Sequence, residues 1–231
     1  MIASTSASDP RASGLLEGET LDTLRLRLAP LIAANAAFDG WSKEALALAA
    51  QNAGVNRDVA ELAFAGGAMT MIEAWFASID RAMAEQFMPE QLAAMKIRAR
   101  ITALVEARLA ILAPHREALR RAQAILAMPL NLPRATRLGW GAADAMWRAA
   151  GDRAVDYNHY TKRATLGGVY AATLLVFVND ESQDFAETRR FLARRIEDIM
   201  RFEKAKARLA PHPDQTFSMT RFLGRLRYRG S

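Results

Sequence analysis

The chain has 231 residues, a net charge of +6 and no cysteine, and 51% of its residues are apolar. The length allows one sizeable domain, or a small module and a larger one. The absence of cysteine excludes disulfides and thiolate metal sites and fits a reducing compartment. Alanine, leucine and arginine dominate while turn residues are sparse, a composition typical of an all-helical protein.

The chain begins with a polar segment and a small helical module. Residues 1–19 lack the apolar core of a signal peptide and the basic pattern of a transit peptide. We therefore expect a disordered tail on a cytoplasmic protein. Residues 20–68 predict helices at 21–38, 43–52 and 57–65, with Thr20 or Asp22, Ser42 and Asn56 as caps. A turn containing glycine joins the last two helices, which is the outline of a helix-turn-helix.

The second helix of this pair does not resemble a DNA-reading helix. Such helices present cationic and amide side chains to phosphates and base edges. The candidate helix offers Asn56 and Arg57, but Asp58 and Glu61 lie beside them. We expect a helix-turn-helix kept for packing and no nucleic-acid partner; the alternative is a DNA-binding module.

Residues 69–209 predict a larger helical domain, with helices at 69–86, 90–112, 115–128 and 134–150. Residues 129–133 predict a rigid non-helical connector, and Gly151 a C-cap. Residues 164–178 have no charge and are too few for the roughly 20 residues that cross a bilayer, so they predict a buried core helix. A polar turn and a basic amphipathic helix at 185–209 follow, and the predicted fold is all-α.

Positive charge is concentrated at the end of the chain. Residues 186–231 have twelve basic and five acidic residues, a net of +7, whereas residues 1–185 have a net of −1. We divide residues 210–231 into a proline hinge and a helix at 217–229 whose apolar side is flanked by arginines. That pattern predicts a helix that binds an anionic membrane surface. The residues assigned to this contact are Phe217, Arg221, Phe222, Leu223, Arg225, Leu226 and Arg227. The alternative is a basic tail that is disordered or packs on its own domain.

The sequence contains no recognisable catalytic or metal-binding constellation. The three histidines lie on separate predicted elements, and no histidine pair has the spacing of metal ligands on a helix. A nucleophile elbow, a phosphate loop and a dinucleotide fingerprint are also absent from the sequence. We therefore expect no enzymatic activity, no cofactor and no metal.

The polar cluster at 151–163, directly before the uncharged segment, allows two interpretations. In the first, Asp152 and Asp156 pair with the neighbouring basic residues, and the two tyrosines of the cluster are half-buried. In the second, Arg163 holds a phosphate or polar headgroup. An acyl or isoprenoid chain then runs along Leu166, Tyr170, Leu174 and Phe177. Two glycines at 167 and 168 permit close approach of that chain or of another helix.

A family resemblance rests on four sequence motifs in this region. They are MWRAAGD at 146–152, DYNHYTKRA at 156–164, VY at 169–170 and DxSxDF at 180–185. Together they resemble the coenzyme Q biosynthesis accessory family, lipid-binding proteins that assist the demethoxyubiquinone hydroxylase. The likeness extends less specifically from about residue 20 to about residue 205.

The resemblance implies a TetR-like all-helical fold, a homodimer, and a helix-turn-helix that no longer serves DNA. It also implies a cavity for isoprenoid quinone precursors, for which we assign Arg163, Leu166, Tyr170, Leu174, Phe177 and Trp147. The patch that docks the hydroxylase is assigned to Asp156, Tyr157, His159, Tyr160 and Lys162; the family commonly has Trp where this chain has His159. The implied location is the cytoplasm, peripheral on the inner membrane. The alternative is a TetR-type ligand-responsive transcriptional regulator, with salt-sensitive DNA binding that depends on Lys43 or Arg57.

Overall fold

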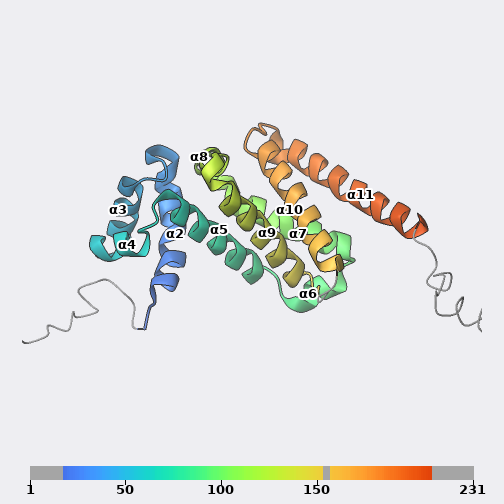
Figure 1. Cartoon of the computed structure of the whole chain (residues 1–231), viewed down its shortest axis with the longest axis horizontal. Helices are drawn as coiled ribbons and strands as arrows, with labels where there is room; N and C mark the ends of the chain where they lie inside the picture. Colours follow the sequence, from blue (N-terminus) through green and yellow to red (C-terminus); the bar gives the residue numbers. More distant parts are fainter. Residues whose placement is uncertain (1–17, 153–156, 210–231) are drawn as a thin grey trace, which may run out of the picture. The chain divides into compact units, whose positions relative to one another are not determined.

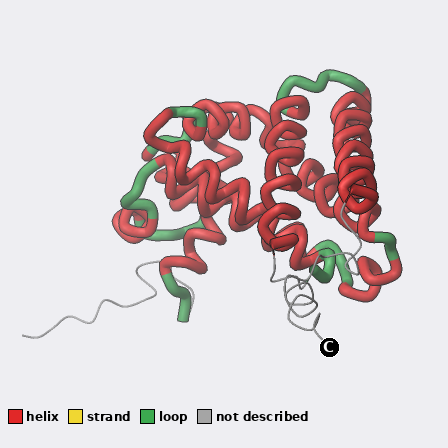
Figure 2. The backbone as a smooth tube through the Cα atoms, turned by 45° about the vertical axis from the view of Figure 1, so that its right-hand side comes forward, coloured by secondary structure: helices red, strands yellow, loops and turns green. Residues whose placement is uncertain are grey.

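The computed structural model describes residues 18–152 and 157–209. The chain divides into two compact units, Met1–Ala193 and Arg194–Ser231. The described residues form helices and turns with no strand, which confirms the predicted all-α fold (Figure 2). Asp156, the segment 1–17 and the segment 210–231 lie outside the described residues. The predictions made for those residues, including all seven assigned to membrane binding, stay predictions, as do the domain limits at residues 68 and 209.

The N-terminal module forms as predicted, from α2 (Leu21–Asp39), α3 (Lys43–Asn52) and α4 (Arg57–Ala63) (Figure 1). Thr20, Ser42 and Asn56 are the N-caps, and the side chain of each accepts a hydrogen bond from a backbone N–H of the first turn. The Trp41 indole N–H donates to the Ala118 carbonyl oxygen at 3.0 Å. This bond ties the module to the rest of the first unit.

The predicted single helix at 90–112 is wrong, because it is broken in two. After α5 (Ala68–Glu85), the chain forms α6 (Pro89–Ala94) and α7 (Ile97–Leu112), with extended backbone between them. Arg100 donates to the carbonyl oxygens of Met95 and Ala93, at 2.9 and 2.8 Å. The break leaves these two carbonyls without a helical N–H partner, and the Arg100 guanidinium supplies one. Apolar periodicity alone cannot predict such side-chain bonds.

The proline-rich connector is shorter and more helical than predicted. The chain continues through η1 (Ala113–His115), α8 (Arg116–Leu126) and η2 (Pro129–Asn131) into α9 (Leu132–Ala149). Pro133 lies in the first turn of α9, where its missing N–H costs no helical hydrogen bond. The expected non-helical connector at 129–133 is therefore a 3₁₀ turn followed directly by α9. Gly151 follows α9 with a φ of 85°, as a helix-ending glycine does.

Helix α10 (Tyr157–Phe177) begins earlier than the predicted helix at 164–178, so the polar residues before Ala164 are helical rather than a turn. The expectation that its uncharged part is buried on all sides is also wrong. One face of α10 is exposed, and its members are Ala164, Thr165, Gly168, Ala171 and Leu175. The opposite face packs on α9, where a Cβ added at Gly167 would lie 3.4 Å from the Gly139 carbonyl oxygen.

A polar corner joins α10 to η3 (Gln183–Phe185) and α11 (Ala186–Leu209). The buried Asp180 carboxylate accepts four hydrogen bonds, from the backbone N–H and the hydroxyl of both Ser182 and Thr188, at 2.5 to 2.9 Å. Burial acts to raise the pKa of Asp180, but these bonds outweigh it and hold the pKa well below its usual value. Arg116 and Arg120 of α8 also donate to the Val178 carbonyl oxygen, at 3.0 and 2.7 Å.

Within the described ranges, no single helix is long and apolar enough to span a membrane. The pair α4 and α5 passes that test jointly by length and composition, with a bend of 84° between the two helices.

Candidate functional site

The polar cluster predicted to form a headgroup site lies between the end of α9 and the beginning of α10. Arg163 is 2% exposed and is held by two carboxylates. Its Nε donates to Asp144 at 2.6 Å and its Nη1 to Asp152 at 3.1 Å. Asp152 also accepts a hydrogen bond from the Lys162 Nζ at 2.7 Å. The pairing of Asp152 with Lys162 and Arg163, the first of the two interpretations from sequence, is present in the structure.

These contacts set the charge state of the cluster. Burial acts to raise the pKa of Asp152, but the hydrogen bonds from Lys162 and Arg163 outweigh it, and the pKa is lowered. The carboxylate therefore stays ionised, and Arg163 is already neutralised by two anions. A phosphate on Arg163 would have to compete with both, so the headgroup role assigned to Arg163 stays a prediction.

Aromatic side chains gather beside this cluster, on the surface that α9 and α10 share. The ring centroids of Trp140 and Tyr160 are 6.0 Å apart, and those of Tyr160 and His159 are 5.2 Å apart. The Lys162 ammonium lies 5.3 Å from the Trp147 ring centroid, and the Trp147 indole donates to the Lys162 carbonyl oxygen at 3.1 Å. We call these five residues the aromatic patch. Within it, Tyr160 is 61% exposed. The patch unites His159, Tyr160 and Lys162, predicted to bind a partner, with Trp147, predicted to bind lipid.

The remaining predicted lipid residues lie in the core of the first unit. Leu166, Tyr170, Leu174 and Phe177 follow one another on the buried face of α10, and none is more than 6% exposed. This spacing is the one that the sequence predicts for a single helix face. Their assignment to lipid stays a prediction.

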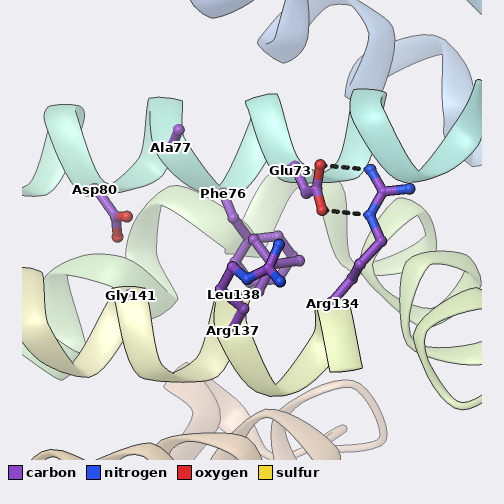
Figure 3. Close-up of a pocket in the computed structure, with 8 residues that line it drawn as sticks. All are labelled: Glu73, Phe76, Ala77, Asp80, Arg134, Arg137, Leu138 and Gly141. Carbon is purple, nitrogen blue, oxygen red and sulfur yellow. Dashed lines mark hydrogen bonds and ion pairs between the residues drawn. The ribbon is translucent and has the colours of Figure 1, made fainter. Parts of the chain in front are cut away.

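Two cavities lie elsewhere, along the seam between α5 and α9, which we call the α5–α9 seam. The first measures about 240 Å³ and is lined by Glu73, Phe76, Ala77, Asp80, Arg134, Arg137, Leu138 and Gly141. Figure 3 shows the ion pair of Glu73 and Arg134 at one end of this cavity and Asp80 at the other. Between these ends lie Phe76, Leu138 and the guanidinium of Arg137, so the cavity has a mixed character.

The second cavity, of about 310 Å³, continues the seam toward the polar cluster. Its lining is mostly apolar: Ala84, Phe87, Pro89, Leu92, Ala93, Arg100, Leu104, Arg148, Ala149, Ala150 and Gly151. Ala149, Ala150 and Gly151 belong to the first sequence motif. Arg100 donates to the Ala150 carbonyl oxygen at 2.8 Å, which joins α7 to the end of α9 across the cavity. The volume is at the lower end of the range of small-molecule sites.

A buried polar cluster lies behind the first cavity. Asp80, which lines the cavity, pairs with Arg108 of α7, and Arg108 is fully buried. The Arg108 guanidinium carbon lies 4.8 Å from the Tyr170 ring centroid. Burial raises the pKa of Asp80, although Arg108 acts to lower it.

The candidate recognition helix of the helix-turn-helix carries paired charges, and the expectation of no nucleic-acid partner stays a prediction. Arg57 pairs with Glu61 at 2.9 Å, so the charge of the candidate recognition helix is largely cancelled. The same helix exposes Leu62 at 63%. In the described part of the chain, no group of three or more histidine, aspartate or glutamate side chains has the geometry of a metal site.

Sequence analysis missed Trp140, Asp80 and Arg108. Trp140 precedes Trp147 by two helical turns, and this spacing was the available signal. Arg108 lies at a core position and Asp80 at a partly buried one, each on an otherwise apolar helix face, so an unexpected charge in the pattern marks both. Apolar periodicity defines the helices, but it does not show that a charged residue within the pattern is functional.

Comparison with known proteins identifies relatives. The family model of COQ9 matches residues 132–203. The "Ubiquinone biosynthesis protein COQ9, mitochondrial" of Rattus norvegicus is 36% identical over 167 residues, which cover 70% of this chain and 54% of the relative. The Homo sapiens protein of the same name is 35% identical over 167 residues, 70% of this chain and 52% of the relative. The chain thus spans about half the length of these curated relatives.

A solved structure gives the fold. The crystal structure of the TetR transcriptional regulator from Nitrosomonas europaea ATCC 19718 superposes with a TM-score of 0.60 at 24% sequence identity. The match covers 76% of this chain and 97% of the regulator. The predicted TetR-like fold is confirmed.

Proposed function

The chain is a relative of the COQ9 proteins of ubiquinone biosynthesis, and we propose that it acts in that pathway as a lipid-binding accessory protein. It binds an isoprenoid quinone precursor and presents it to the demethoxyubiquinone hydroxylase at a membrane surface. The chain itself does not catalyse the reaction. The α5–α9 seam is the observation that supports this proposal most directly.

The shape of the seam suits an elongated ligand. The two cavities lie at successive positions along α5 and α9, and α6 and α7 supply much of the lining of the second. The first has polar groups for a ring substituted with oxygens, and the second has mostly apolar walls for a hydrocarbon tail. Each methylene group taken out of water contributes about 0.8 kcal/mol to binding.

The aromatic patch is the proposed docking face for the hydroxylase. Tyr160 and Trp140 present aromatic area at the surface, and aromatic residues are enriched in the energetic centres of interfaces. His159 stands where the family commonly has Trp, and its smaller ring retains a flat contact with less apolar area. The patch adjoins the motif residues that line the second cavity, so docking and ligand transfer would take place next to each other.

Assembly and location are further parts of the proposal. The exposed face of α10 from Ala164 to Leu175 is apolar and free of charge, which suits a homodimer contact. The helix predicted at 217–229 would hold the protein on an anionic inner-membrane surface from the cytoplasmic side. The curated relatives are described as mitochondrial.

A pair of neighbouring alanines on α6 provides the test. Both alanines are exposed, but Ala93 lines the second cavity and Ala94 does not. Ala93→Phe should fill the cavity and weaken binding of decylubiquinone at least about ten-fold, because several methylene groups lose their burial. Ala94→Phe should leave binding within about two-fold. Equilibrium dialysis measures both, and equal binding by the two variants would contradict a ligand site in the seam.

A further inference from the structure

The polar cluster behind the first cavity contains donors with no partner. Arg108 pairs with Asp80 through Nη1, but its Nε and Nη2 are buried and have no hydrogen-bond partner among the described residues. The same is true of the Tyr170 hydroxyl. Tyr170 packs against the Arg108 guanidinium, so the three unpaired atoms belong to one small region between α5, α7 and α10.

Unpaired polar atoms of this kind need an explanation. Most buried polar groups in native proteins are hydrogen-bonded, and leaving one unpaired costs about 1–3 kcal/mol. Three at one place would be a substantial cost to the free protein. An occupant that accepts hydrogen bonds removes that cost.

We propose that the Arg108 guanidinium and the Tyr170 hydroxyl bind an uncharged oxygen, a carbonyl or a hydroxyl, on the ring of the ligand that occupies the α5–α9 seam. This inference rests on the proposed lipid-binding function and assigns the polar end of its site. Neither Arg108 nor Tyr170 lines the cavity; Asp80, which does, pairs with Arg108 and is the side chain that the ligand oxygen meets first.

Charge selects a neutral acceptor over an anion. Arg108 already has a counter-ion in Asp80, so an anionic headgroup would place a second negative charge beside a partly buried carboxylate. Burial raises the pKa of Tyr170, so its hydroxyl stays protonated and able to donate. A ring carbonyl or hydroxyl accepts both donors without adding charge.

Two buried hydroxyls of α10 allow a matched test. The Tyr170 hydroxyl is unpaired, whereas the Thr173 hydroxyl donates to the Val169 carbonyl oxygen at 2.7 Å. Tyr170→Phe removes an oxygen that has no hydrogen-bond partner of good geometry among the described residues, and Thr173→Val removes one that is already bonded. The full chain of each variant is titrated with decylubiquinone, and with decylbenzene as a probe that has the same tail but no ring oxygen.

The expected results separate binding from stability. Tyr170→Phe should weaken decylubiquinone binding about 3- to 10-fold, the equivalent of one hydrogen bond. It should leave decylbenzene binding and Tm unchanged, or raise Tm. Thr173→Val should leave both affinities unchanged and lower Tm by about 2–4 °C.

Several outcomes would overturn the inference. Equal decylubiquinone binding by wild type and Tyr170→Phe would show that the hydroxyl does not contact the ligand. A fall in Tm together with a fall in the binding of both probes would show that the hydroxyl supports the fold. If the wild-type chain binds neither probe, the proposed lipid-binding function fails as well, and that result is distinct from the first two.

Discussion

At the scale of single residues, Arg163 joins the two helices that surround the motif. Its guanidinium bonds Asp144 of α9 and Asp152 after α9, and all three side chains are mostly buried. The sequence indicated that Arg163 and Asp152 would pair, because they lie in one polar cluster. It did not indicate Asp144, whose approach depends on how α9 packs against α10.

Replacing Arg163 should be costly because Asp144 and Asp152 lose the buried cation that they share and keep only the more exposed Arg148 and Lys162. We expect Arg163→Met to lower the free energy of unfolding by about 3 kcal/mol at pH 7. Lys162→Met removes a 38% exposed cation from the same Asp152 and should cost about 1 kcal/mol or less. Urea unfolding measures both, and equal losses would contradict the central place given to Arg163.

Asp180 gives the corner before α11 a pH-dependent contribution. Its folded-state pKa lies below the unfolded value of about 3.9, so the stabilisation is complete above that pH and is lost as the pH falls below it. Asp180→Asn should lower the free energy of unfolding by about 2 kcal/mol at pH 7, because an amide nitrogen replaces one acceptor oxygen. The difference from wild type should shrink below about pH 4. A difference that is independent of pH would contradict the assignment of the ionised form.

At the scale of elements, sequence periodicity located most helices, missed the break between α6 and α7, and placed the starts of α9 and α10 too late. The break between α6 and α7 escaped prediction because apolar positions continue through it, while Arg100 supplies the missing partners from outside the local pattern. The helix predicted at 164–178 begins too late because only its uncharged residues indicated a buried helix, whereas α10 starts at Tyr157. A helix can have a polar first part when, as with Arg163 and Lys162, ion pairs hold it.

Two adjacent glycines on α10 have different surroundings. A side chain at Gly167 would press on the backbone of α9, whereas a Cβ at Gly168 meets nothing within 4 Å. Gly167→Leu should lower the free energy of unfolding by about 1–3 kcal/mol, and Gly168→Ala should raise it by up to about 1 kcal/mol through helix propensity. Thermal unfolding distinguishes them, and similar effects at the two sites would contradict the close packing of α9 and α10.

At the scale of the whole molecule, the proposed function combines an apolar seam, an aromatic patch and a basic C-terminal segment. The composition and the motifs led to the resemblance and to the fold. They did not lead to the seam, because a cavity between α5 and α9 depends on the packing of residues distant in sequence. The face of α10 that the sequence assigns to lipid lies in the core of the first unit, and its assignment to lipid stays a prediction.

The basic C-terminal segment should determine membrane association. Residues 210–231 contain the apolar and arginine positions of the predicted interfacial helix. Deleting residues 217–231 should release the protein from vesicles that contain anionic lipid, while the helical content of the remainder changes little. Flotation with anionic and with neutral vesicles measures this, and unchanged binding of the shortened chain would contradict the membrane role of the segment.

The most direct test of the account is the content of the protein as it is purified. Organic extraction followed by mass spectrometry should recover an isoprenoid lipid or quinone precursor in near-stoichiometric amount. The Ala93→Phe variant, purified in the same way, should yield much less. Recovery of no stoichiometric lipid or quinone from the wild-type chain would contradict the claim that this protein binds and presents a lipid.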